Sequence, residues 1–108
     1  MFTVIYRFEV KNNKQKEFVF AWKELTKLIY EFEGSLGSRI HHEKDNIYIA
    51  YAQWPSRKVW ENFGANLPDI AKEHSANMKS ACIKTETIHE LEMLVDLLAN
   101  QPFKAVKN

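Results

Sequence analysis

The sequence contains little cysteine, glycine or proline, and neither charge is in large excess. Its single cysteine, Cys82, cannot form a disulfide within the chain, which is usual in a reducing compartment and predicts the cytoplasm. The three glycines, Gly34, Gly37 and Gly64, do not match the glycine pattern of a phosphate-binding loop, so we expect no such loop. The 15 lysine and arginine residues nearly balance 14 aspartate and glutamate residues, so the net charge of +1 gives no strong attraction for nucleic acid.

The sequence has no apolar run long enough to span a membrane. The N-terminal stretch MFTVIYRFEV contains Arg7 and Glu9 and lacks a small-residue cleavage site, so we expect neither a signal peptide nor a membrane span there. Hydrophobic residues make up 45% and charged residues 27%, which is typical of a globular protein, and 108 residues fit one domain. We therefore expect a single domain with no membrane or nucleic-acid partner.

The most informative stretch that is present, residues 47–63, predicts a strand followed by a helix. Apolar and aromatic residues occupy both alternating faces of Ile47–Trp54. Pro55 cannot donate to a strand ladder and ends the strand, and Ser56 can cap a helix that begins at Arg57. A strand that is apolar on both faces needs cover on both faces.

The chain before this stretch predicts a strand, a helix and a second strand. Residues 2–10 alternate as a half-buried strand, and a capping-box pattern of Asn12 and Gln15 predicts the start of a helix. Gly34 offers a left-handed cap at the end of that helix, and residues 36–43 predict a strand that pairs with the next one as a hairpin. The residues expected on the core face of the helix are Phe18, Trp22, Leu25, Ile29 and Phe32.

The chain after this stretch predicts a broken helix and a last strand. Gly64 interrupts the helix, which restarts near residue 68. A strand follows over about 83–93, and a short helix and a tail over 94–108. The residues expected to share one face of the restarted helix are Ile70, His74, Met78 and Ala81.

This order of elements is typical of an α+β fold, the ferredoxin-like split βαβ, with a four-stranded antiparallel sheet and both helices on one face. The other sheet face would be exposed in a monomer, together with apolar side chains of Ile47–Trp54. We therefore expect a homodimer in which two such sheets pack face to face.

The segment FEGSLGSRIHHEKDNIYIAYAQWPSRKVWENF resembles the centre of antibiotic biosynthesis monooxygenase domains, which belong to the dimeric α/β barrel group. The shared features are a glycine-rich entry to the second strand, a hairpin, and a strand that ends in tryptophan before a polar helix start. On this resemblance, residues 1–93 form the domain and residues 94–108 the short C-terminal helix and tail. Members of the family include oxygenases that act on aromatic polyketides or quinols without metal or flavin, and haem-degrading monooxygenases.

The resemblance implies a monooxygenase that acts on a small aromatic or quinol substrate without a cofactor. The substrate anion must then deliver an electron to oxygen, so the site needs an apolar slot and groups that deprotonate and hold the ring oxygen. His74 is the candidate base, and Arg39 or His42 the candidate oxyanion partner. The residues expected to line the slot and bind substrate are Tyr6, Tyr51, Trp54, Trp60 and Phe63.

The same residues leave other interpretations open. His74 can be a histidine that is satisfied by hydrogen bonds in the core, and the aromatic residues can simply be core residues of a dimer that binds a small apolar molecule without catalysis. In the haem-degrading branch a histidine near the position of His74 holds the iron, but that branch has an asparagine and a tryptophan where this sequence has Tyr6 and Phe63. His41 and His42 point to opposite faces of a strand, so we expect no metal site.

Overall fold

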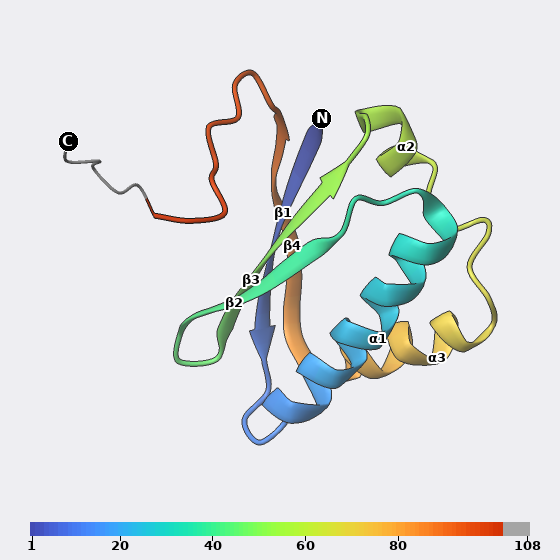
Figure 1. Ribbon diagram of the computed structural model, residues 1–108. Helices are drawn as coiled ribbons and strands as arrows, with labels where there is room; N and C mark the ends of the chain where they lie inside the picture. The colour runs from blue at the N-terminus through green and yellow to red at the C-terminus, as the bar shows by residue number, and fades with distance from the viewer. Residues whose placement is uncertain (103–108) are drawn as a thin grey trace.

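The computed structural model describes residues 1–102, which form one four-stranded antiparallel sheet and three helices (Figure 1). In chain order the elements are β1 (Phe2–Val10), α1 (Gln15–Glu33), β2 (Ser38–Lys44), β3 (Ile47–Trp54), α2 (Arg57–Glu61), α3 (Ile70–Ser80) and β4 (Cys82–Glu92). The strand order in the sheet is β2-β3-β1-β4, and α1 and α3 pack together over one face (Figure 1). The predicted ferredoxin-like α+β fold is therefore confirmed.

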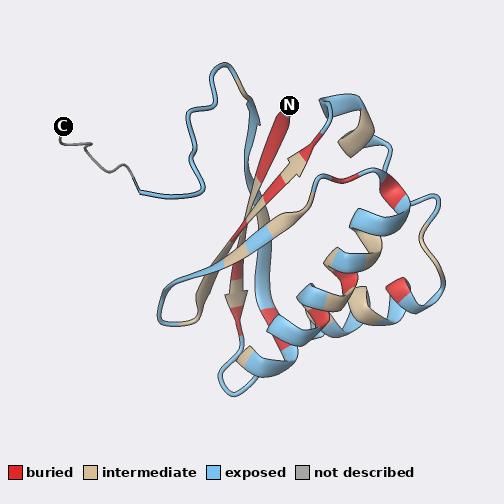
Figure 2. Cartoon of the chain, viewed as in Figure 1, coloured by how far each residue is buried: buried red, intermediate tan, exposed pale blue. Residues whose placement is uncertain are grey.

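The pairing of β1 with β3 decides which side chains meet the helices. Val4 lies opposite Ala52, and Tyr6 lies opposite Ala50. Because successive side chains of a strand alternate between faces, the even-numbered residues of both strands share the helix-covered face. The buried residues concentrate there, as the red segments of these two strands show (Figure 2), and they are Phe2, Val4, Phe8, Val10, Ala50, Ala52 and Trp54.

The long helix α1 buries most of its predicted stripe. Phe18 is fully buried, with its ring centroid 5.0 Å from that of Phe8 and 5.3 Å from that of Tyr48. Phe32 was expected in the core but is 42% exposed. Gly34 ends the helix at φ 76°, which confirms the predicted left-handed cap.

The predicted capping box at the start of α1 is wrong. The residue that caps α1 is Lys14, and its side chain makes no capping hydrogen bond. The side chains of Asn12 and Gln15 bind Asn46 in the β2–β3 turn instead: Asn12 accepts from the Asn46 amide, and Gln15 Nε2 donates to Asn46 Oδ1 at 2.9 Å. A tertiary contact thus uses the polar groups that would otherwise have capped the helix.

The helices α2 and α3 differ in how their first turns are capped and packed. Ser56 caps α2 as predicted, because its Oγ accepts a hydrogen bond from the Val59 amide at 3.3 Å. The predicted core face of the restarted helix is confirmed at Ala81, which is buried, and at Met78, which packs against the core. It is wrong at the start of α3, where Ile70 is 47% exposed and its neighbour Ala71 is buried instead. One residue turns a helix by about 100°, so this shift changes which side chains reach the sheet.

The described chain after β4 contains no helix. Residues 93–102 run without regular structure, so the short helix predicted after residue 93 is not formed, and most of the predicted tail lies outside the described residues. Leu94 is 92% exposed and Leu97 is 89% exposed. An apolar stripe stabilises a short helix only when a surface is available to bury it, and this segment has none in the single chain.

Candidate functional site

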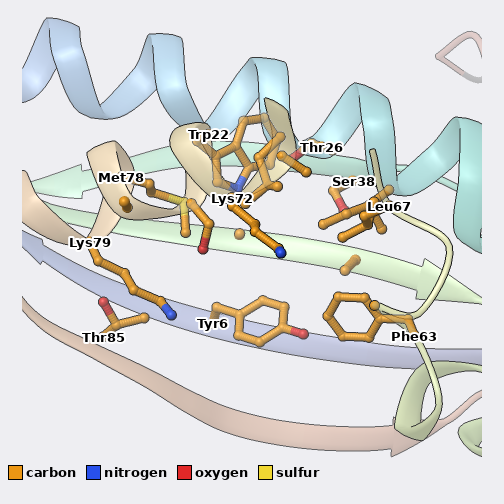
Figure 3. A pocket seen from close by; sticks show the side chains of 18 of the residues that line it. Tyr6, Trp22, Thr26, Ser38, Phe63, Leu67, Lys72, Met78, Lys79 and Thr85 are labelled. Atoms are coloured by element: carbon orange, nitrogen blue, oxygen red, sulfur yellow. The ribbon is translucent and has the colours of Figure 1, made fainter. Parts of the chain in front are cut away.

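A cavity of about 640 Å³ lies between the helix-covered face of the sheet and the inner sides of α1 and α3 (Figure 3). Small residues create this space. Ala50 and Ala52 on β3 and Ala71 and Ser75 on α3 all line it, so the helix and the sheet face each other with short side chains. A volume of this size is usual for sites that bind small organic molecules.

Aromatic side chains form the larger surfaces of the cavity. Trp22 reaches in from α1, Tyr6 lies on the sheet below it, and Phe63 closes one end from the loop after α2 (Figure 3). The Phe63 ring lies against Trp54, with 5.1 Å between ring centroids. Flat apolar walls of this kind suit a planar aromatic ligand, because stacked and tilted rings gain contact area and favourable ring electrostatics.

Tyr6 is the central polar group on the sheet side of the cavity. Its hydroxyl oxygen accepts a hydrogen bond from Trp60 Nε1 at 2.8 Å. Burial raises the pKa of Tyr6 above its ordinary value, with the Trp60 hydrogen bond opposing the shift in part and the charge of Glu90 adding to it. The hydroxyl is therefore protonated at neutral pH, and since its oxygen already accepts from Trp60, its own proton is available to a ligand.

Two lysines of α3 extend into the cavity (Figure 3). Lys72 and Lys79 are seven residues apart, so they lie on the same side of the helix about 10 Å apart along its axis. Among residues 1–102 neither lysine forms an ion pair with a carboxylate. No aspartate or glutamate lines the cavity. The charged groups of the site are therefore all positive.

Glu33, the last residue of α1, holds the loop that carries Phe63. Its buried carboxylate accepts hydrogen bonds from the backbone amides of Gly64 at 2.6 Å and Asn66 at 3.0 Å, and from Asn66 Nδ2 at 3.3 Å. Two residues of this loop, Gly64 and Leu67, line the cavity. Glu33 is thus a positioning residue for this end of the cavity.

Of the residues predicted to bind substrate, Tyr6, Trp54 and Phe63 line the cavity. Trp60 stands behind them, where it bonds to Tyr6 and packs against Phe2 with 5.6 Å between ring centroids. Tyr51 lies on the opposite face of the sheet, as its odd number on β3 requires, and its hydroxyl accepts from Gln53 Nε2 at 2.9 Å.

The three residues predicted to act in catalysis are not brought together at this cavity. His74 was expected to point toward the sheet, but its ring lies beside Phe20 of α1, 6.4 Å between centroids, and its Nδ1 is buried without a hydrogen-bond partner in the described chain. Arg39 is exposed on the open face of the sheet opposite Tyr51. His42 is exposed near the hairpin turn, where its Nε2 lies 2.8 Å from the Asp45 carbonyl oxygen.

The sequence patterns did not predict a role for Lys72, Lys79 or Glu33 at the site. Lys72 and Lys79 do carry a sequence signal, since their seven-residue spacing places them on one helix face with Ala71 and Ser75. Glu33 carries no sequence signal, because its hydrogen-bond partners lie more than 30 residues away in a loop of irregular backbone.

The fold and the cavity define a ferredoxin-like α+β protein with an aromatic-lined pocket between its sheet and helices. Residues 1–72 match the family model of antibiotic biosynthesis monooxygenase, and the chain belongs to that family. No curated protein matches the sequence significantly. In the described chain, no helix is long and apolar enough to cross a bilayer, and no group of three or more acidic, histidine or cysteine side chains could hold a metal ion.

Several solved structures share this fold at low sequence identity. SnoaB, a cofactor-independent oxygenase from Streptomyces nogalater, is 18% identical with a TM-score of 0.72, covering 89% of this chain and 95% of its own. A Caulobacter crescentus protein assigned to the same family is 17% identical with a TM-score of 0.73, covering 87% and 90%. A conserved protein from Methanosarcina mazei is 20% identical with a TM-score of 0.68, covering 83% and 89%.

Proposed function

We propose that this protein is a cofactor-independent monooxygenase that oxidises a small electron-rich aromatic molecule, a phenol or hydroquinone, in the cavity between its sheet and α3. Membership of the antibiotic biosynthesis monooxygenase family supports the reaction type. The observation that carries the assignment to this cavity is its composition: aromatic walls around a protonated tyrosine donor and two ammonium groups.

These groups suit the substrate side of such a reaction. A hydroquinone and dioxygen give a hydroxyquinone and water: one oxygen atom forms the new bond to carbon, the other leaves as water, and the substrate supplies all four electrons. The positive charges of Lys72 and Lys79 favour the deprotonated substrate, which is the better electron donor. The Tyr6 hydroxyl donates a hydrogen bond to the ring oxygen and so fixes the ring in the slot.

Oxygen consumption with a panel of hydroquinones tests this proposal, with isotopically labelled dioxygen to follow the label into product. We expect Tyr6→Phe to slow turnover at least about tenfold, the effect of one hydrogen bond to a charged oxygen. Tyr30→Phe changes an exposed tyrosine of α1 outside the cavity and serves as the matched control. Absence of labelled product for the whole panel, or equal rates for Tyr6→Phe and wild type, would refute the proposal.

His74→Ala distinguishes this arrangement from the one expected from the sequence. If the cavity groups act on the substrate, the variant keeps a turnover near that of wild type, because His74 lies beside Phe20 and does not line the cavity. A loss as large as that of Tyr6→Phe would instead return the base to His74.

A second candidate function is non-catalytic binding of a small apolar molecule by the same cavity. The observation that favours it is that none of the three residues first expected to act in catalysis lines the cavity. Native mass spectrometry of the purified protein distinguishes the two functions. A retained aromatic molecule that is recovered unchanged after exposure to oxygen would favour binding over catalysis.

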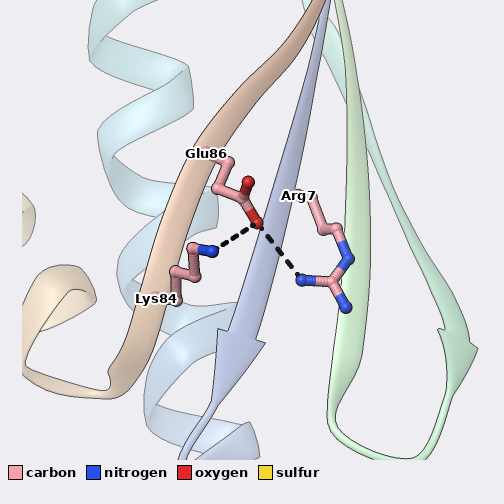
Figure 4. Close-up of polar contacts among 3 residues, drawn as sticks. All are labelled: Arg7, Lys84 and Glu86. Atoms are coloured by element: carbon pink, nitrogen blue, oxygen red, sulfur yellow. Dashed lines mark hydrogen bonds and ion pairs between the residues drawn. The ribbon is translucent and has the colours of Figure 1, made fainter.

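We also propose that the protein acts as a homodimer joined through the open face of its sheet. The half-buried side chains of Ile5, Ile47, Ile49 and Tyr51 lie on that face. The charged side chains beside them are already paired within the chain: Glu86 Oε1 lies 3.3 Å from Arg7 and 3.6 Å from Lys84 (Figure 4). A second copy could therefore cover this face without burying unpaired charge from this group. Sedimentation equilibrium at micromolar concentration tests the assembly, and a folded species of monomer mass would overturn it.

A further inference from the structure

The charge of the cavity exceeds what a phenol substrate needs. Two ammonium groups, Lys72 and Lys79, extend into a space that no aspartate or glutamate lines. The Tyr6 hydroxyl adds a neutral donor, and the other polar side chains of the lining, Thr26, Ser38, Ser75 and Thr85, carry no charge. A single phenolate neutralises only one of the two positive charges.

The geometry points to an aromatic acid as the ligand: a planar ring system that carries a permanent carboxylate in addition to its ring oxygen. The two lysines lie about 10 Å apart along α3, so they can hold two anionic groups at separate positions on one small molecule. This inference rests on the proposed function for the choice of cavity and adds the chemical class of the substrate.

The lysines have apolar cavity wall on one side and solvent on the other. Much of the cavity wall is apolar, with Trp22, Ile29, Ala50 and Met78 among its members. Lys72 and Lys79 are themselves exposed, so an ion pair between either lysine and a ligand is partly screened by water, and the apolar walls add to binding mainly through contact with the ligand ring. The lysines themselves have no competing carboxylate within the described chain, and a ligand carboxylate would be their first anionic partner.

Binding of naphthoate and its neutral analogue naphthamide tests the inference without any oxygen chemistry. The two probes have the same ring system and nearly the same shape, and neither is a hydroquinone. The three tryptophans of the chain, Trp22, Trp54 and Trp60, line the cavity or contact Tyr6, so intrinsic fluorescence reports on occupancy. We expect naphthoate to bind about tenfold more tightly than naphthamide, and high salt to weaken only the acid.

The variants are Lys72→Gln, Lys79→Gln and the double substitution, each checked by circular dichroism. Lys16→Gln is the control, because Lys16 lies on α1 beside a separate hollow and does not line this cavity. The double variant should lose the preference for the acid, whereas the control should keep it. Equal binding of the two probes to wild type, no binding of either probe, or a preference that survives the double substitution would each overturn the inference.

The outcomes separate this inference from the proposed function. If naphthoate is preferred through the lysines but no hydroquinone is oxidised, the cavity binds aromatic acids and the monooxygenase proposal fails. If neutral hydroquinones are oxidised and the acid is not preferred, the monooxygenase stands and the inference fails.

Discussion

Substitution of Glu33 tests whether the loop that carries Phe63 is held in place by α1, because this buried residue joins the end of α1 to that loop. Its carboxylate accepts three hydrogen bonds, two of them from the backbone amides of Gly64 and Asn66 at 2.6 and 3.0 Å. Glu33→Ala removes all three acceptor contacts and leaves the loop without its attachment to the helix. We expect a less stable protein with a less ordered cavity mouth.

The expected loss of stability is the difference between the hydrogen bonds that are lost and two effects that offset part of this loss. Two good hydrogen bonds to a charged acceptor contribute about 1.5 kcal/mol each, and the third, at 3.3 Å, contributes little. Water replaces part of this in the variant, because Gly64 and Asn66 are exposed. Removal of a negative charge from the C-terminal end of a helix also returns about 0.5 kcal/mol. The free energy of unfolding should therefore fall by about 2 kcal/mol.

Urea unfolding followed by circular dichroism measures this change, at one fixed protein concentration because dimerisation would add to apparent stability. Glu31→Ala is the matched control, since Glu31 is an exposed glutamate one half-turn earlier in α1 that makes no ion pair within residues 1–102. If the unfolding free energy of Glu33→Ala lies within about 0.5 kcal/mol of wild type, the usual range of surface substitutions, Glu33 does not anchor the loop. Weaker naphthoate binding by the variant would link the loop to the cavity.

Three further predictions concern Tyr6, Cys82 and the open sheet face. Burial raises the pKa of Tyr6 above 10.0, so its contribution to stability is complete below pH 10.0 and is lost as the pH rises through the raised pKa. Tyr6→Phe should therefore reduce the fall in unfolding free energy at alkaline pH. Identical plots of unfolding free energy against pH for the variant and wild type would contradict this. Burial also raises the pKa of the Cys82 thiol, so iodoacetamide should modify the native protein at least about tenfold more slowly than the urea-unfolded chain, and equal rates would count against a buried thiol. Ile49→Lys places a charge in the proposed dimer interface and should shift the sedimentation equilibrium toward the monomer, whereas Lys58→Ala on the exposed side of α2 should not. If Ile49→Lys remains a dimer, the interface does not include this sheet face.

The strands and helices up to the end of β4, and their order along the chain, follow from the sequence. Turn and cap residues act locally, so Gly34 and Ser56 could be assigned their roles before any contact was known. Alternation along β1 also placed Tyr6 on the same face as its buried neighbours Val4 and Phe8. These predictions succeeded because each depends on residues that are close in the chain.

The groups that meet at the cavity depend on contacts between segments that are distant in the chain. The hydrophobic pattern of α3 placed His74 toward the sheet, but in the structure Lys72 and Lys79 line the cavity and the His74 ring lies beside Phe20. A short helix made mostly of small and polar residues has no strong apolar stripe, so its orientation is set by the surfaces of α1 and the sheet. Glu33 depends in the same way on a loop 31 residues away, which no local pattern could have indicated.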